Sequence, residues 1–146
     1  MRILIINGPN LNMLGIREPS IYGNHTLEKL EENIKKYCKR KSIKIKFKQS
    51  NYEGKIIKYI HKAYKKEYDG IVINPGAFTH YSYAIFDAIK AVNIPTVAVH
   101  ISDINNREEF RKKSVIKDAC IKEIIGLGFK GYTDAIKFLY RFVSKN

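Results

Sequence analysis

The chain has 146 residues, of which 45% are hydrophobic and 28% are charged. This length suits one domain with its own hydrophobic core and is too short for a (β/α)8 barrel, while the apolar fraction excludes an intrinsically disordered chain. Lys and Arg number 27 against 14 Asp and Glu, and this formal net charge of +13 suits capture of an anionic molecule. We therefore expect a single domain over residues 1–146.

The first predicted element is a strand over residues 3–6, an unbroken apolar run of sequence ILII. Such a run is typical of a strand buried on both faces of a parallel sheet. The turn residues Asn7, Gly8 and Pro9 end it. A long irregular segment follows, and a loop of this kind after a parallel strand is usually functional. We predict that residues 10–24 form an active-site lid.

Helices and strands alternate along the rest of the chain. Apolar residues at helical spacing predict helices over residues 27–40, 56–64, 84–92 and 133–143, the first of them capped by Thr26. Apolar or alternating runs predict strands over residues 42–48, 70–74, 96–101 and 123–127, and the alternation with Lys in 42–48 suits a sheet edge. This order predicts an α/β fold with a doubly wound parallel sheet.

Polar side chains follow the predicted strands that end near Ile6, Asn74 and Ile101. The carboxyl ends of parallel strands lie at one edge of a sheet, so we expect these side chains to line a common crevice. The candidates are Asn10, Arg17, Tyr22, Asn74, His80, His100, Ser102 and Arg111. Amides, imidazoles, hydroxyls and guanidinium groups together suit a small hydroxylated carboxylate.

Nothing in the sequence calls for a cofactor, a metal or a membrane. Cys38 and Cys120 show no metal-ligand spacing, so we expect reduced core thiols. The turn at Gly8 lacks both a dinucleotide fingerprint and a phosphate-loop lysine. The first apolar run ends too early for a signal peptide, and no later run reaches membrane-spanning length. We expect a cofactor-free, cytoplasmic protein.

Several motifs carry a family resemblance. They are NGPNLN at 7–12, REP at 17–19, YG at 22–23, QSNYEG at 49–54, INPGAFTH at 73–80, VHIS at 99–102 and REEFR at 107–111. In this order they resemble the type II 3-dehydroquinate dehydratases of the shikimate pathway. The resemblance implies a flavodoxin-like sandwich with a five-stranded parallel sheet. It also implies cofactor-free dehydration of 3-dehydroquinate by anti elimination through an enolate, and a homo-oligomer, typically a dodecamer built of trimers.

The resemblance also implies catalytic roles. Tyr22 is the base that removes the proton next to the ketone, and Arg17 is the cation that favours its phenolate, since an ordinary tyrosine has a pKa of about 10. Asn10 holds a water that stabilises the developing enolate. His100 protonates the departing hydroxyl as general acid.

The remaining implied roles concern binding. The backbone amides of Ile101 and Ser102, with the Ser102 hydroxyl, hold the substrate carboxylate. Three side chains grip the ring hydroxyls, namely those of Asn74, His80 and Arg111. Asp87 is implied to reach the active site of a neighbouring subunit.

One departure from the family pattern affects the acid. The family usually has Glu two residues before the histidine, where it polarises the ring, and this chain has Ala98. We expect acid catalysis to be slower or to be supported by another carboxylate, for which Asp103 is a candidate. On this interpretation Ala98→Glu raises turnover.

Two other functions stay open. Because of Ala98, the chain is alternatively a catalytically weakened homologue that binds a polyhydroxy carboxylate. Because of the charge, a basic nucleic-acid-binding α/β module is a less favoured alternative. Its best patch places Lys62, Lys65 and Lys66 beside Tyr59, Tyr64 and Tyr68. A Schiff-base dehydratase is disfavoured, since no lysine lies in the shared motifs.

Overall fold

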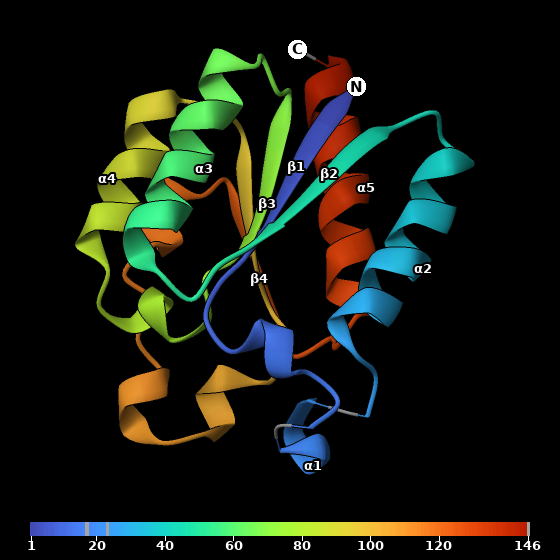
Figure 1. Ribbon diagram of the computed structural model, residues 1–146. Coiled ribbons are helices and arrows are strands. Elements are labelled where there is room, and N and C mark those ends of the chain that lie inside the picture. The colour runs from blue at the N-terminus through green and yellow to red at the C-terminus, as the bar shows by residue number, and fades with distance from the viewer. Residues whose placement is uncertain (17, 23, 146) are drawn as a thin grey trace.

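Five parallel strands form one sheet in a computed structural model that describes residues 1–16, 18–22 and 24–145 (Figure 1). The strands are β1 (Arg2–Asn7), β2 (Lys44–Gln49), β3 (Gly70–Asn74), β4 (Thr96–His100) and β5 (Lys122–Ile125). Their order is β2-β1-β3-β4-β5, and every neighbouring pair is parallel. This is the flavodoxin-like strand order, which confirms the predicted fold class.

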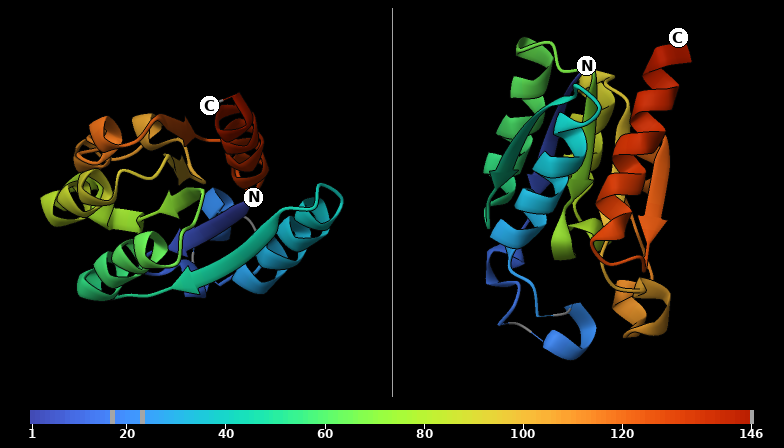
Figure 2. Two further views of the ribbon diagram at one scale, coloured as in Figure 1. Left: turned by 90° about the horizontal axis from the view of Figure 1, so that it is seen from above. Right: turned by 90° about the vertical axis from the view of Figure 1, so that its right-hand side faces the viewer.

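Helices cover both faces of the sheet, as Figures 1 and 2 show. Helices α2 (Leu27–Lys39) and α5 (Lys130–Lys145) lie on one face, and α3 (Glu53–Lys65) and α4 (Tyr83–Val92) lie on the other. Alternate residues of β1 enter the two cores: Ile3 and Ile5 join the first, and Leu4 and Ile6 join the second. No helix in the described part of the chain is both long and apolar enough to cross a membrane.

The predicted elements are present, with small shifts at their ends. Thr26 caps α2 by accepting a hydrogen bond from the Lys29 backbone at 3.2 Å, and β2 lies at a sheet edge, both as predicted. Helix α5 begins at Lys130, three residues before the predicted start. The segment predicted as an irregular lid, residues 10–24, includes the short helices η1 (Leu11–Met13) and α1 (Pro19–Tyr22). One helical turn is too short to produce a periodic apolar pattern.

The turns after β1 and β3 pack closely against each other. A Cβ atom added to Gly8 would lie 2.5 Å from the carbonyl carbon of Pro75, and one added to Gly76 would lie 2.9 Å from the carbonyl oxygen of Pro9. Gly76 also has a positive φ of 58°, a backbone conformation that residues other than Gly rarely adopt. The two glycines therefore allow the loops that follow β1 and β3 to meet at the carboxyl edge of the sheet.

Replacing Gly8 by Ala should destabilise the protein. The new methyl group would overlap backbone atoms of Pro75, which cannot move without shifting the turn. Overpacking of this kind costs about 1–3 kcal/mol of unfolding free energy, measurable by urea denaturation. Gly54→Ala is the matched control, because nothing lies within 4 Å of its added Cβ and the residue is helical. A Gly8→Ala variant as stable as Gly54→Ala would contradict the close-packing account.

Candidate active site

One pocket at the carboxyl edge of the sheet collects most of the predicted site residues. Its lining includes Asn10, Tyr22, Asn74, His80, His100, Ile101, Ser102 and Arg111. They come from the loop after β1, from α1, from the ends of β3 and β4, and from the short helices η2 (Gly76–His80) and η4 (Glu109–Arg111). Arg17 lies outside the described residues, and Asp87 lies on an exposed position of α4 rather than in the pocket lining.

The motif at 49–54 supports the loop that carries Asn10. The Asn10 backbone, in the left-handed conformation with φ of 68°, donates a hydrogen bond to the Asn51 side chain at 3.0 Å. The Gln49 amide donates to the Gly8 carbonyl at 3.2 Å and to Asn51 at 3.1 Å. This second loop therefore fixes where Asn10 enters the pocket, without itself contributing to the pocket lining.

A buried tyrosine orients Asn74. The Tyr132 hydroxyl accepts a hydrogen bond from the Asn74 amide at 2.9 Å and donates to Asn7 at 2.7 Å. Burial raises the pKa of Tyr132 far above its ordinary value, so this phenol stays neutral. The Asn74 side-chain oxygen also accepts from the Gly76 backbone at 3.2 Å. Tyr132 lies on α5, 58 residues from Asn74, and no local sequence pattern predicted a role for it.

His80 presents one nitrogen to the pocket as an acceptor. Its Nδ1 lies 2.7 Å from the Lys113 carbonyl oxygen, which only accepts, so Nδ1 carries the proton and Nε2 is left as the acceptor. Burial lowers the pKa of His80, with help from the positive charges of His100, Arg111 and Arg107, although the Lys113 hydrogen bond opposes the shift. A neutral His80 can accept a hydrogen bond from a ligand hydroxyl.

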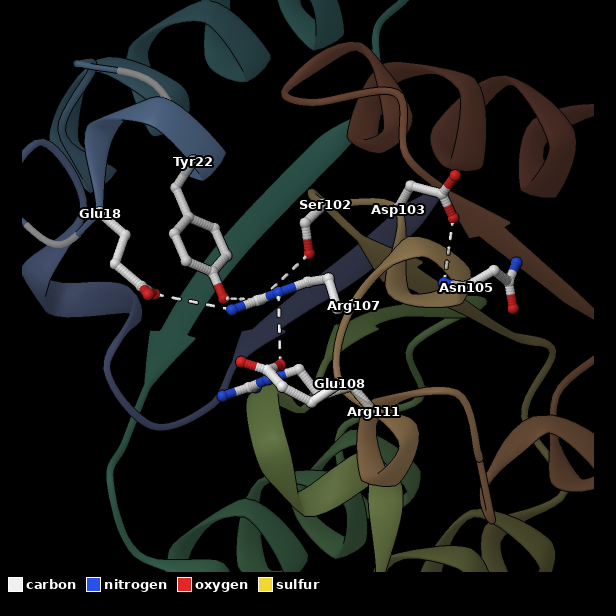
Figure 3. A network of polar contacts seen from close by, with 8 residues as sticks. All are labelled: Glu18, Tyr22, Ser102, Asp103, Asn105, Arg107, Glu108 and Arg111. Carbon is white, nitrogen blue, oxygen red and sulfur yellow. Dashed lines mark hydrogen bonds and ion pairs between the residues drawn. The ribbon is translucent and has the colours of Figure 1, made fainter.

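Tyr22 faces Arg107, as Figure 3 shows. One guanidinium nitrogen of Arg107 donates a hydrogen bond to the Tyr22 phenol oxygen and lies 3.5 Å from the Ser102 hydroxyl. The guanidinium carbon is 5.3 Å from the centre of the Tyr22 ring, and Glu18 approaches another nitrogen at 3.6 Å. The Arg107 side chain is only 10% exposed. Among the residues that the structure describes, Arg107 is therefore the cation beside the Tyr22 phenol.

Arg107 belongs to the REEFR motif, from which only Arg111 was predicted to be a site residue. Both arginines line the pocket, and Glu108 lies near both, with its carboxylate 2.6 Å from the Arg111 guanidinium and 3.9 Å from that of Arg107. Both arginines belong to this one motif, and that shared motif was the available signal for Arg107.

His100 has a buried carboxylate partner. Its Nε2 atom lies 2.7 Å from a Glu123 carboxylate oxygen, and the two side chains are only 5% and 8% exposed. Burial by itself raises the pKa of the Glu123 carboxyl. Hydrogen bonds from His100 and Ser114, with the charges of His100 and Lys117, outweigh burial and leave the pKa below its ordinary value. Glu123 is therefore a carboxylate at neutral pH.

This contact bears on the expectations based on Ala98, because a carboxylate other than the candidate Asp103 contacts His100. His100 does not lack a carboxylate neighbour, so the reason for expecting Ala98→Glu to raise turnover is removed. Asp103 is not the substitute, because its carboxylate accepts from the Asn105 backbone at 3.1 Å and from the Asn106 amide at 2.6 Å. Glu123 was not predicted, because its contact with His100 depends on the pairing of β4 with β5.

Two further features bear on the other predicted functions. Among the described residues, no group of three or more His, Cys, Asp or Glu side chains is arranged to hold a metal ion.

A separate groove lies beside β2 and α3, and part of the predicted basic patch lines it. Its lining includes Arg2, Lys46, Lys48, Tyr59, Lys62, Lys66 and Tyr68, whereas Tyr64 and Lys65 are outside it.

Comparison with known proteins gives a consistent family assignment. The family model described as dehydroquinase class II matches residues 1–140. The chain is 60% identical over 135 residues to the 3-dehydroquinate dehydratase of Caldicellulosiruptor saccharolyticus, covering 92% of this chain and 93% of that protein. It is 57% identical over 145 residues to the enzyme of the same name from Clostridium acetobutylicum, covering 99% and 100%. The crystal structure of type II dehydroquinase from Butyrivibrio crossotus superposes with a TM-score of 0.95 at 56% identity, covering 96% of this chain and 97% of that one. The chain belongs to the class II dehydroquinase family.

Proposed function

We propose that this chain converts 3-dehydroquinate to 3-dehydroshikimate by anti elimination of water through an enolate. The observation that supports this most directly is that a tyrosine beside a guanidinium and a histidine beside a carboxylate line one pocket. Such a pair supplies a base and an acid to the same small molecule. The family's shikimate-pathway role suits a cytoplasmic enzyme, and the chemistry needs no cofactor.

Tyr22 is the base in this proposal. The Arg107 guanidinium favours negative charge on the phenol oxygen, because the two groups are in direct contact within a mostly buried site. The phenolate removes the proton next to the ketone, and charge moves to the ketone oxygen. Asn10 holds a water that stabilises this enolate oxygen. Arg17, on the same lid, is proposed as a second cation.

His100 is the acid. It protonates the hydroxyl that departs as water, while Tyr22 acts from the lid and His100 acts from the end of β4. The proposed carboxylate site consists of the backbone amides of Ile101 and Ser102 with the Ser102 hydroxyl. Asn74, His80 and Arg111 are proposed to bind the ring hydroxyls, for which the neutral His80 supplies an acceptor.

An assay of the purified protein tests this function. The product is a conjugated enone, whose ultraviolet absorbance separates it from 3-dehydroquinate. We expect product formation at low enzyme concentration. Lack of product at high enzyme concentration, with retained binding of 3-dehydroquinate, would instead support the weakened homologue that only binds a polyhydroxy carboxylate.

We propose that the face of α4 bearing Asp87 meets a neighbouring subunit in a dodecamer built of trimers. Asp87 is exposed, and the nearby aromatic residues Tyr81 and Tyr83 are 60% and 59% exposed. Exposed aromatic side chains are common at subunit interfaces. Light scattering should give the mass of a twelve-subunit particle, and Tyr83→Glu should reduce it. A monomer that is fully active at assay concentration would contradict the role of Asp87 in a neighbouring site.

The basic groove beside β2 gives a second candidate function, binding of a nucleic acid. It combines five cationic side chains with two tyrosines. Electrostatic binding of this kind weakens steeply as salt is raised. Salt-sensitive binding of RNA or DNA that is lost in a Lys62→Gln, Lys66→Gln variant and retained in Tyr22→Phe would support it.

A further inference from the structure

We propose that Glu123 is the positioning residue for the acid, supplied by the strand next to the one that carries His100. This inference rests on the proposed function, since it concerns the residue that protonates the leaving hydroxyl. Glu123 is not part of the pocket lining. It therefore acts on the substrate only through the imidazole that it contacts at 2.7 Å.

Strand pairing explains why this carboxylate can serve His100. Ala98 and Glu123 are directly paired across β4 and β5, so their side chains point to the same face of the sheet. His100 lies two residues after Ala98 and also points to that face. A carboxylate at either paired position can thus approach the same ring.

The contact also assigns the two nitrogens of His100. An ionised carboxylate only accepts hydrogen bonds, so Nε2 keeps its proton and points it at Glu123. Nδ1 is then the nitrogen that exchanges a proton with the substrate. In the elimination step the Nδ1–H bond breaks, the proton joins the departing hydroxyl to form water, and the ring is left neutral with its Nε2 proton in place. The carboxylate stabilises the cationic ring before this step.

Other charged groups act on the same ring and stay unchanged in the tests below. The pocket side of His100 is shared with His80, Arg107, Arg111 and Tyr22. Behind it, Glu123 is held by Ser114 and lies in the field of Lys117. The two arginines oppose a positive charge on His100, and the Glu123 carboxylate, in direct contact with the ring, favours it.

Glu123→Gln tests the charge while keeping the shape. We expect kcat to fall about 10- to 100-fold with little change in KM, since the residue does not contact the substrate. The alkaline limb of the kcat profile should move to lower pH by about one unit. Asp134→Asn is the control, because it removes an ion-paired carboxylate on α5. Unchanged kcat and an unmoved limb in a folded Glu123→Gln protein would overturn the inference.

Relocating the carboxylate gives a second test. Glu123→Ala should lose more activity than Glu123→Gln, and adding Ala98→Glu to it should recover at least about tenfold of the loss. In the wild-type background, Ala98→Glu should lower turnover, because two paired carboxylates would repel each other. A double variant that folds but stays as slow as Glu123→Ala would show that Glu123 acts by packing alone.

A measurement on the ring separates this inference from the proposed function. Nitrogen NMR of the neutral His100 ring should show the proton on Nε2 in the wild type and a mixed population in Glu123→Ala. This readout needs no turnover, so a wild type with the expected tautomer and no enone product would refute the proposed function alone. A proton on Nδ1 in the neutral wild-type ring would refute the assignment of nitrogens and with it the inference.

Discussion

Replacing Tyr22 by Phe should lower turnover by about 10³-fold, near the upper part of the range for loss of a general base. The variant keeps the aromatic ring, whose centre lies 5.3 Å from the Arg107 guanidinium carbon, and removes only the oxygen that accepts the hydrogen bond. Binding of 3-dehydroquinate should change little, because no binding role is assigned to that oxygen. The enone assay gives kcat, and calorimetric titration gives the dissociation constant.

Tyr64→Phe provides the matched control for Tyr22→Phe. Tyr64 is 66% exposed on α3, outside the lining of the candidate active site, so its oxygen should not affect turnover. If Tyr22→Phe retained a tenth or more of wild-type kcat, the base would have to be another group. A large loss of binding with kcat preserved would instead identify Tyr22 as a binding residue.

Local sequence patterns were sufficient for most of the fold. The period of two in residues 42–48 indicated the edge strand, and the continuous run over residues 70–74 indicated a strand that is buried on both faces, as β3 is. The short helices η1 and α1 were not predicted. A single turn such as α1 is indicated by Pro19 at its first position and shows no repeating apolar pattern. Strand order came only from the family resemblance, because the alternation of elements fits several orders.

The residues of the candidate site also divide into those that local sequence patterns predicted and those that they did not. Residues at the carboxyl ends of strands, such as Asn74 and His100, were found because topology alone brings them to one edge. Contacts between distant segments were not found: Tyr132 reaches Asn74 from α5, and Glu123 reaches His100 across a strand pair. The family resemblance indicates that a carboxylate is missing at Ala98, but only the register of β4 and β5 brings Glu123 near His100.

Arg107 was not predicted as a site residue, and its substitution should have the second largest effect on kcat. Arg107→Gln should lower kcat about 10²-fold, because the phenol oxygen of Tyr22 loses the adjacent charge that favours the phenolate. The loss should be smaller than in Tyr22→Phe, since a phenol remains to act as a base when it ionises. Arg40→Gln is the control, as Arg40 is an exposed residue at the end of α2.

A double-variant comparison distinguishes action through Tyr22 from a direct effect on the substrate. If Arg107 acts through the phenol, adding Arg107→Gln to Tyr22→Phe should cost little more, because the group that it stabilises is already absent. If the two losses multiply, Arg107 contributes to catalysis independently, for example through the Ser102 hydroxyl that lies 3.5 Å away. Arg107→Lys should recover only part of the activity, since a single ammonium cannot contact Tyr22, Ser102 and Glu18 as the planar guanidinium does.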